Sequence, residues 1–128
     1  MLHHFRVIFI LLLLLAGCTT ADTQTIKAVS PKEAAGLQAN QFAVIVDVRT
    51  NEEWQQGHIP GAIHIPLDTL ASQKERLKQY QDRTLIMQCR SGHSSAQAVT
   101  LLQEAGFQNV VNLQGGILAW HAAHLPIE

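Results

Sequence analysis

The sequence lacks an excess of charge of either sign, and this absence limits the partners it can have. Its 128 residues include 9 Lys and Arg against 10 Asp and Glu, which gives a formal net charge of −1. No cluster of Lys or Arg interleaved with aromatic residues occurs along the chain. Because nucleic-acid-binding proteins carry such a basic pattern, we expect no nucleic acid among the partners of this protein.

Cysteine is scarce, since only Cys18 and Cys89 occur. They do not form a Cys-x-x-Cys pair, which disfavours a thiol oxidoreductase of the thioredoxin kind. Ligands for a metal are equally few. His58 and His64 stand close in sequence, but two histidines without a third ligand are a weak signal, so we expect no metal site.

A hydrophobic run long enough to span a bilayer is also missing. Arg6 precedes an unbroken apolar run, residues 7–16, whose length suits the core of a signal peptide but falls short of a transmembrane helix. The run ends in Leu-Ala-Gly-Cys, which resembles the lipobox of bacterial lipoproteins. That resemblance implies cleavage and lipidation at Cys18. The alternative is an ordinary secretory signal with an incidental cysteine.

These features divide the chain into three parts. We expect residues 1–17 to be a lipoprotein signal peptide, residues 18–25 a short polar tether and residues 26–128 the folded domain. The lipoprotein resemblance implies a lipid anchor in the bacterial cell envelope, with the domain facing the periplasm. Thr19 stands where lipoproteins of the inner membrane often have Asp, which favours the outer membrane.

Cys89 would then be the one free thiol of a domain in an oxidising compartment. With the other cysteine lipidated, no internal disulfide can form. A lone exported thiol is exposed to oxidation and to pairing between molecules, so its presence calls for a chemical role.

Helical and strand patterns alternate through the domain. Helices are expected over 31–39, for one turn between Thr50 and Gly57, over 67–80 with a break near Ala71, over 94–105 with Ala98, Leu101, Leu102 and Ala105 on its inner face, and over 117–123. Strands are expected over 42–46, 62–65, 85–88 and 110–113. This order predicts an α/β fold, with a parallel sheet flanked by helices on both faces and the carboxyl ends of its strands at one edge.

The segment 88–95 is the most informative part of the chain. It reads as a strand end, a tight loop with one glycine, and the start of a helix, so its backbone N–H groups should converge on an anion beside the Cys89 thiol. The helix N-terminus and the neighbouring Arg90 and His93 should lower the pKa of this thiol. The alternative is that Cys89 is a small core residue at a strand end.

The loop Cys89-Arg90-Ser91-Gly92 resembles the active-site loop of the rhodanese family, in which the cysteine carries a persulfide. Other segments match the family in order and at its spacing: Asp47-Val48-Arg49, Glu53, residues 57–62 and 64–66, and Gly115-Gly116 with Trp120. The resemblance covers residue 26 to the end. It implies that the Cys89 thiolate takes a sulfane sulfur from a small anionic donor such as thiosulfate. The persulfide then passes it to cyanide or a thiol, without a cofactor.

The resemblance also implies roles for individual residues. Cys89 would be the catalytic residue, and the loop would bind the substrate through Arg90, Ser91, Gly92, His93, Ser94 and Ser95. Many family members have Arg at the position of Ser94, which leaves Arg90 as the only fixed charge of this loop and leaves the charge preference for the substrate open. Asp47, Arg49, Glu53 and His58 are expected to support the loop, since Asp–Arg pairs beside a strand end are more often structural than catalytic.

Two other functions compete with this interpretation. A cysteine phosphatase needs a longer loop with an Arg near its end to hold phosphate, and Ser94 and Ser95 occupy those positions here. A binding module on the same fold is the other alternative, either for another envelope protein or as a sulfur-carrier partner. Loss of the loop cysteine would favour it. Cys89 is present, although the acceptor could still be a protein thiol.

Overall fold

The computed structural model describes residue 17 and residues 26–128. The expected signal peptide, apart from residue 17, and the expected tether with Cys18 lie outside the described residues and stay predictions. The elements in chain order are β1 (Ala28–Val29), α1 (Pro31–Ala39), β2 (Ala43–Asp47), α2 (Asn51–Gln56), β3 (Ile63–His64), α3 (Leu67–Gln73), the 3₁₀ helix η1 (Lys74–Tyr80), β4 (Thr84–Gln88), α4 (His93–Glu104), β5 (Val110–Leu113) and α5 (Gly116–Ala122). None of the helices in this described part is long and apolar enough to cross a membrane.

The five strands form one parallel sheet in the order β1-β5-β4-β2-β3. The central pair is in register along its whole length, from Ala43 opposite Thr84 to Asp47 opposite Gln88. Because parallel strands point the same way, the segments that follow β2 and β4 emerge side by side at one edge of the sheet. This edge carries Cys89, directly after Gln88.

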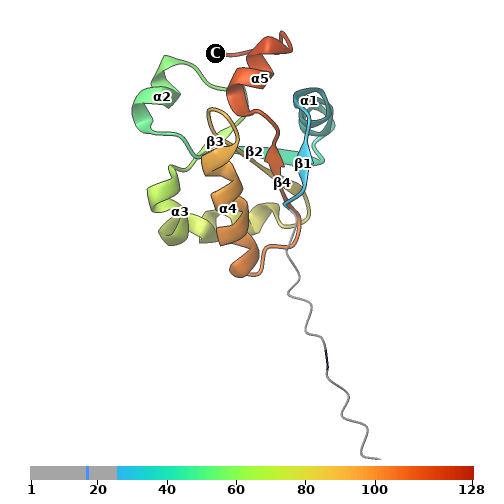
Figure 1. Ribbon diagram of the computed structural model, residues 1–128, viewed down its shortest axis with the longest axis vertical. Coiled ribbons are helices and arrows are strands. Elements are labelled where there is room, and N and C mark those ends of the chain that lie inside the picture. The colour runs from blue at the N-terminus through green and yellow to red at the C-terminus, as the bar shows by residue number, and fades with distance from the viewer. Residues whose placement is uncertain (1–16, 18–25) are drawn as a thin grey trace, which may run out of the picture.

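Helices cover both faces of the sheet, as the alternating pattern predicts (Figure 1). Along β2, Val44 and Val46 pack in the cluster that contains residues of α3, η1 and α4. Ala43 and Ile45 lie between them in sequence and pack in the other cluster, which contains residues of α1 and α5. A strand buried on both faces needs apolar residues at every position, which explains the continuous β-branched run. The expected α/β fold is confirmed.

Several element boundaries differ from the expectations. Phe42 is 65% exposed and lies outside β2, which begins at Ala43. The helix expected over 67–80 changes type at Lys74, not near Ala71, and continues as 3₁₀. In α4 the buried face includes Val99, whereas Ala105 is exposed and caps the helix. The strand β1 was missed, since two residues show no periodicity.

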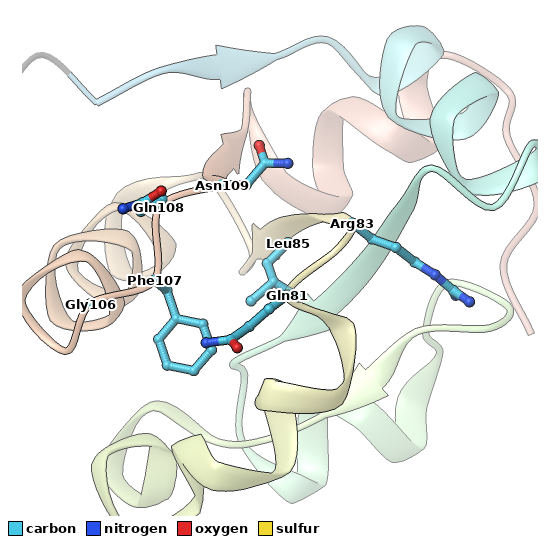
Figure 2. A pocket seen from close by; sticks show the side chains of 7 residues that line it. All are labelled: Gln81, Arg83, Leu85, Gly106, Phe107, Gln108 and Asn109. Carbon is cyan, nitrogen blue, oxygen red and sulfur yellow. The ribbon is translucent and has the colours of Figure 1, made fainter.

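A cavity of about 330 Å³ opens at the amino ends of β4 and β5, and Cys89 is not part of its lining. Figure 2 shows the side chains that line it. The cavity is lined by Gln81, Arg83, Leu85, Gly106, Phe107, Gln108 and Asn109, and the Arg83 side chain extends away from the others. Among these described residues there is no cysteine, histidine or carboxylate. Cys89 lies at the opposite edge of the sheet, after the carboxyl end of β4.

Candidate active site

Cys89 lies between the end of β4 and the start of α4 and is only 4% exposed. The chain turns there through Gly92, which precedes α4 with a φ of 101° in the left-handed region. This conformation strains any residue with a Cβ, and the position where a Cβ would stand is 3.5 Å from the backbone nitrogen of Gly115. Glycine thus allows the tight turn that folds the loop around the sulfur.

The Cys89 sulfur is the focus of hydrogen-bond donors from the loop. The backbone N–H of Gly92 donates to Sγ over 3.0 Å, and the Ser95 Oγ lies 3.2 Å from it. Burial raises the pKa of the Cys89 thiol, but donors from Ser95, Gly92 and Ser91 outweigh burial and bring the pKa below its ordinary value. The site therefore favours a thiolate.

The cause of that lower pKa agrees with the expectation in part. The backbone amides at the helix N-terminus were expected and are among the groups responsible, together with the Ser95 hydroxyl, whereas the charges of Arg90 and His93 are not. Both Arg90 and His93 are exposed. Preorganised dipoles in a buried site stabilise charge more effectively than cations that water screens.

The start of α5 is hydrogen-bonded to the backbone of the active-site loop. The backbone N–H groups of Ile117 and Leu118 donate to the carbonyls of Cys89 and Arg90 over 2.9 and 3.2 Å. A Cβ added at Gly116 would overlap the Arg90 carbonyl, and the φ of Gly116 is 60°. The expected Gly115-Gly116 turn thus does more than end a strand: it lets α5 approach the backbone of the active-site loop.

Asn112 forms a second support that sequence reasoning missed. Its Nδ2 donates to the Gly92 carbonyl over 2.9 Å, and its Oδ1 lies 2.6 Å from the Ser95 Oγ. Asn112 belongs to β5, so it reaches the loop across the sheet. The signal that could have found it is a lone amide in the otherwise apolar strand Val-Val-Asn-Leu.

On the opposite side of Cys89, Asp47 and Arg49 form a buried ion pair. Asp47 is fully buried, the Arg49 side chain is 8% exposed, and Nη2 of Arg49 lies 2.7 Å from Oδ2 of Asp47. The same Nη2 donates to the Gly57 carbonyl over 2.8 Å. The pair therefore joins the end of β2 to the end of α2, which is the geometry of a structural support.

Helix α2, on the same side, carries Glu53 and Trp54, and two histidines stack on Trp54. Glu53 completes a capping box with Thr50 at the start of α2. The His58 and His64 rings lie nearly parallel to the Trp54 indole, with centroids 3.7 and 4.8 Å away. His58 Nδ1 donates to the Trp54 carbonyl over 3.0 Å and His64 Nε2 to the Arg49 carbonyl over 2.8 Å.

Trp54 is the second residue that sequence reasoning missed, because its stacking partners come from the segments that follow α2. Both histidines are occupied by this stack and by backbone carbonyls. No group of three His, Cys, Asp or Glu that could hold a metal ion occurs among the residues that the structure describes.

A cavity of about 640 Å³ opens beside the sulfur. We name it the Cys89 cavity; it is lined by Val48, Arg49, Thr50, Asn51, Glu52, Glu53, Pro66, Leu67, Asp68, Thr69, Cys89, Arg90, Ser91 and Ser94. Of the loop residues expected to bind substrate, Arg90, Ser91 and Ser94 line this cavity, while Gly92 and Ser95 contact Sγ directly. His93 is exposed and is not part of the described lining. The arrangement can hold a small anion or a sulfur-bound group against the thiolate.

Comparisons with known proteins agree with this geometry. The family model described as rhodanese-like domain matches residues 30–123. A sulfurtransferase of Allochromatium vinosum is 39% identical over 91 residues, which cover 71% of this chain and 83% of that protein. The probable adenylyltransferase/sulfurtransferase MoeZ of Mycobacterium tuberculosis is 39% identical over 93 residues, 72% of this chain. The match spans only 24% of that protein, so it corresponds to one part of a longer chain.

A solved structure has the same fold. The crystal structure of a thiosulfate sulfurtransferase from Pseudomonas aeruginosa superimposes with a TM-score of 0.70 and is 27% identical. The superposition covers 81% of this chain and 19% of the other. Fold, loop and relatives thus point to one family.

Proposed function

This chain belongs to the rhodanese-like domain family, and from that membership we propose that it is a sulfurtransferase that carries a sulfane sulfur as a persulfide on Cys89. One observation carries the proposal: the Cys89 Sγ lies within hydrogen-bond distance of the Gly92 N–H and the Ser95 hydroxyl at the end of a cavity. A purely structural cysteine needs no such donors. Relatives named sulfurtransferase support the same activity.

In the first step, the Cys89 thiolate attacks the outer sulfur of a donor such as thiosulfate. A bond forms between Sγ and that sulfur, the sulfur–sulfur bond of thiosulfate breaks, and sulfite leaves with the bonding electron pair. The negative charge of the resulting persulfide lies on its outer sulfur. Backbone N–H groups of the loop and the hydroxyls of Ser91 and Ser94, which line the cavity, are suited to stabilise that charge.

In the second step, an acceptor attacks the outer sulfur of the persulfide. Cyanide yields thiocyanate, and a thiolate yields a new persulfide; in both cases the bond to Sγ breaks and Cys89 departs as a thiolate. The low pKa of the Cys89 thiol makes it a good leaving group in this step. Each cycle returns the free thiolate, so no redox cofactor takes part.

The experiment is mass spectrometry of the full chain after treatment with thiosulfate. We expect the peptide that contains Cys89 to gain the mass of one sulfur, which cyanide then removes. Cys89→Ser should show no adduct and no thiocyanate formation, with little change in thermal unfolding, since a hydroxyl fits the same position but cannot hold a sulfane sulfur. Thiocyanate production by Cys89→Ser would contradict the persulfide mechanism.

A protein thiol as the physiological acceptor is a second candidate, and the size of the Cys89 cavity favours it. Its volume of about 640 Å³ falls within the range of cavities that bind drug-sized ligands, and thiosulfate, with five atoms, fills only a small part of it. A peptide segment that presents a cysteine would use the remaining space. Transfer of labelled sulfur from loaded Cys89 to a cysteine-containing peptide, at a rate above that for free cysteine, would support this acceptor. Equal rates would contradict it.

We also propose that Cys18 is lipidated and holds the domain at the envelope membrane, facing the periplasm. Support for this comes from the sequence resemblance to a lipobox alone. Fatty-acid labelling of the intact protein should be lost in Cys18→Ser and retained in Cys89→Ser. Labelling that persists in Cys18→Ser would overturn the lipoprotein assignment without affecting the sulfurtransferase proposal.

A further inference from the structure

The Ser95 hydroxyl faces two acceptors but has only one proton to donate. Its oxygen lies 3.2 Å from the Cys89 Sγ and 2.6 Å from the Asn112 Oδ1. The orientation of the Asn112 amide is fixed, because its Nδ2 donates to the Gly92 carbonyl over 2.9 Å and a carbonyl cannot donate in return. Oδ1 must therefore face Ser95 as an acceptor, and it competes with the sulfur for the proton.

The state of the sulfur decides which acceptor receives the proton. A thiolate is charged, and hydrogen bonds to charged acceptors are about twice as strong as neutral ones, so Ser95 then donates to Sγ. The Asn112 Oδ1 is left facing a hydroxyl oxygen without a proton between them, which costs free energy because Ser95 is fully buried. When Sγ carries a sulfane sulfur, its charge has moved to the outer sulfur, and a neutral bivalent sulfur is a weak acceptor.

We propose that Asn112 is a positioning residue for sulfur transfer, whose Oδ1 accepts the hydrogen bond of the Ser95 hydroxyl when Cys89 becomes loaded and thereby stabilises the persulfide relative to the free thiolate. No covalent bond is involved, only the exchange of one hydrogen bond for another. The loading half of this inference rests on the proposed sulfurtransferase function. The competition for the proton exists in the unloaded protein and is measurable without any sulfur transfer.

Other charges near the sulfur stay constant in the test. The charged and titratable groups that face Cys89 from neighbouring elements, or begin α4, are Arg49, Glu52, Glu53, Asp68, Arg90 and His93. Within the part of the chain that the structure describes, no hydrogen bond or ion pair joins them to Ser95 or Asn112. Substitution at Asn112 therefore changes the competition for one proton and leaves these charges in place.

The test compares Asn112→Ala with Asn112→Asp by the pH dependence of alkylation of Cys89, followed in the full chain by mass spectrometry of its peptide. Alanine removes the competing acceptor, so the midpoint should move to lower pH by about 0.4 to 1 unit. Aspartate keeps an acceptor and adds a charge that repels the thiolate, so the midpoint should move to higher pH. A residue that only holds the loop in shape would move both variants in one direction, and that result would overturn the proposal.

The matched control repeats Asn112→Ala in a Ser95→Ala background, where no proton is left to compete for. The midpoint should then stay unchanged on substitution of Asn112, and an equal shift in both backgrounds would overturn the proposal. If Asn112→Ala fails to fold, Asn112→Leu, which has nearly the size of asparagine but no acceptor and no charge, makes the same test in both backgrounds.

Loading supplies a second readout. In a fixed mixture of cysteine persulfide and cysteine, the ratio of loaded to free Cys89 should fall roughly twofold to tenfold in Asn112→Ala. Unchanged loading with a shifted midpoint would overturn the stabilisation of the persulfide. Absence of loading in the wild-type chain with every donor would instead overturn the sulfurtransferase proposal, while the alkylation midpoints still decide whether Asn112 competes for the proton.

Discussion

The two walls of the Cys89 cavity differ in the kind of polar group they present. The loop wall, residues 89–95, offers hydrogen-bond donors to the sulfur at distances of 3.0 and 3.2 Å. The facing wall comes from the first turns of α2 and α3 and carries the carboxylates of Glu52, Glu53 and Asp68. Hydrogen-bond donors thus lie at the sulfur, whereas carboxylates line the facing wall.

This difference separates two tasks that are easily confused. Stabilising an anionic sulfur requires short, directed hydrogen bonds in a buried place. Attracting a free anion from solution requires a positive field at the entrance. Among the described residues of the lining, the one cation outside an ion pair is Arg90, since Arg49 is paired with Asp47. The site is built for the first task more than for the second.

The loop wall can be disrupted by adding one methyl group at Gly116. In Gly116→Ala the new Cβ would meet the Arg90 carbonyl at a residue whose φ is 60°, so the free energy of unfolding should fall by about 1 to 3 kcal/mol, with loss of sulfur transfer. Gly36→Ala is the matched control. Gly36 lies inside α1, and no atom lies within 4 Å of the position where a Cβ would stand. Alanine there should raise the free energy of unfolding by about 0.5 to 1 kcal/mol, measured by chemical denaturation. Equal stability of the Gly116 variant and the wild type would contradict the close packing of α5.

Removing the charge of Arg90 should weaken the binding of charged sulfur donors to the loop wall and leave the binding of neutral sulfur donors nearly unchanged. Arg90→Ala should lower kcat/KM for thiosulfate about tenfold, equivalent to ~1.4 kcal/mol, mainly through KM. A neutral persulfide donor should change by much less. Steady-state kinetics with both donors measures the difference, and Arg90→Lys, which keeps the charge, serves as the control. An equal, small loss for both donors would exclude Arg90 from binding the donor.

Removing carboxylates from the facing wall should raise kcat/KM for thiosulfate rather than lower it. Glu52→Gln and Asp68→Asn each remove a carboxylate from an exposed position, so each should raise kcat/KM for thiosulfate about twofold to threefold at low salt. The gain should vanish at high ionic strength because screening removes the repulsion. Glu75→Gln offers a control, since Glu75 pairs with Lys78 on η1, away from the cavity. Slower thiosulfate kinetics in the two cavity variants would reverse this view of the facing wall.

The smallest expected effect concerns stability and pH. The folded pKa of the Cys89 thiol lies below its ordinary value, so between these two values the unfolded chain binds the proton and the folded chain does not. Stability from this group is therefore present above the ordinary pKa and is lost as pH falls through the folded pKa. Cys89→Ser should flatten the rise of unfolding free energy with pH in this interval, measured by urea denaturation. A Cys89→Ser curve parallel to that of the wild type would show that the loop does not favour the thiolate.

The sequence predicted the sheet, its coverage and the position of the reactive loop, because each depends on patterns within a short segment. The β-branched run of β2, the capping box at Thr50 and the turn at Gly92 are local signals of this kind. What remained hidden depends on contacts between distant segments. Asn112 supports the loop from β5, and the N–H groups of α5 bind the loop carbonyls.

The source of the low pKa was predicted only in part, for the same reason. The helix N-terminus pointed to the loop amides, but the sequence also suggested the charges of Arg90 and His93, which stand near the cysteine, and did not point to the Ser95 hydroxyl. In the structure both are exposed, while the buried Ser95 hydroxyl and the loop amides reach the sulfur. Which neighbour turns inward is decided by the left-handed turn at Gly92 and by the packing of α4, not by distance along the chain.

The edge strand β1 connects the amino end of the domain to the strand that supports the active-site loop. Its flanking carbonyls, Lys27 and Val29, accept the N–H groups of Asn112 and Gln114 over 2.9 Å each. The first of these bonds is made by Asn112, the residue whose side-chain amide supports the active-site loop. Hydrogen exchange of the Asn112 and Gln114 amide protons would therefore report how firmly β1 is held beside that support.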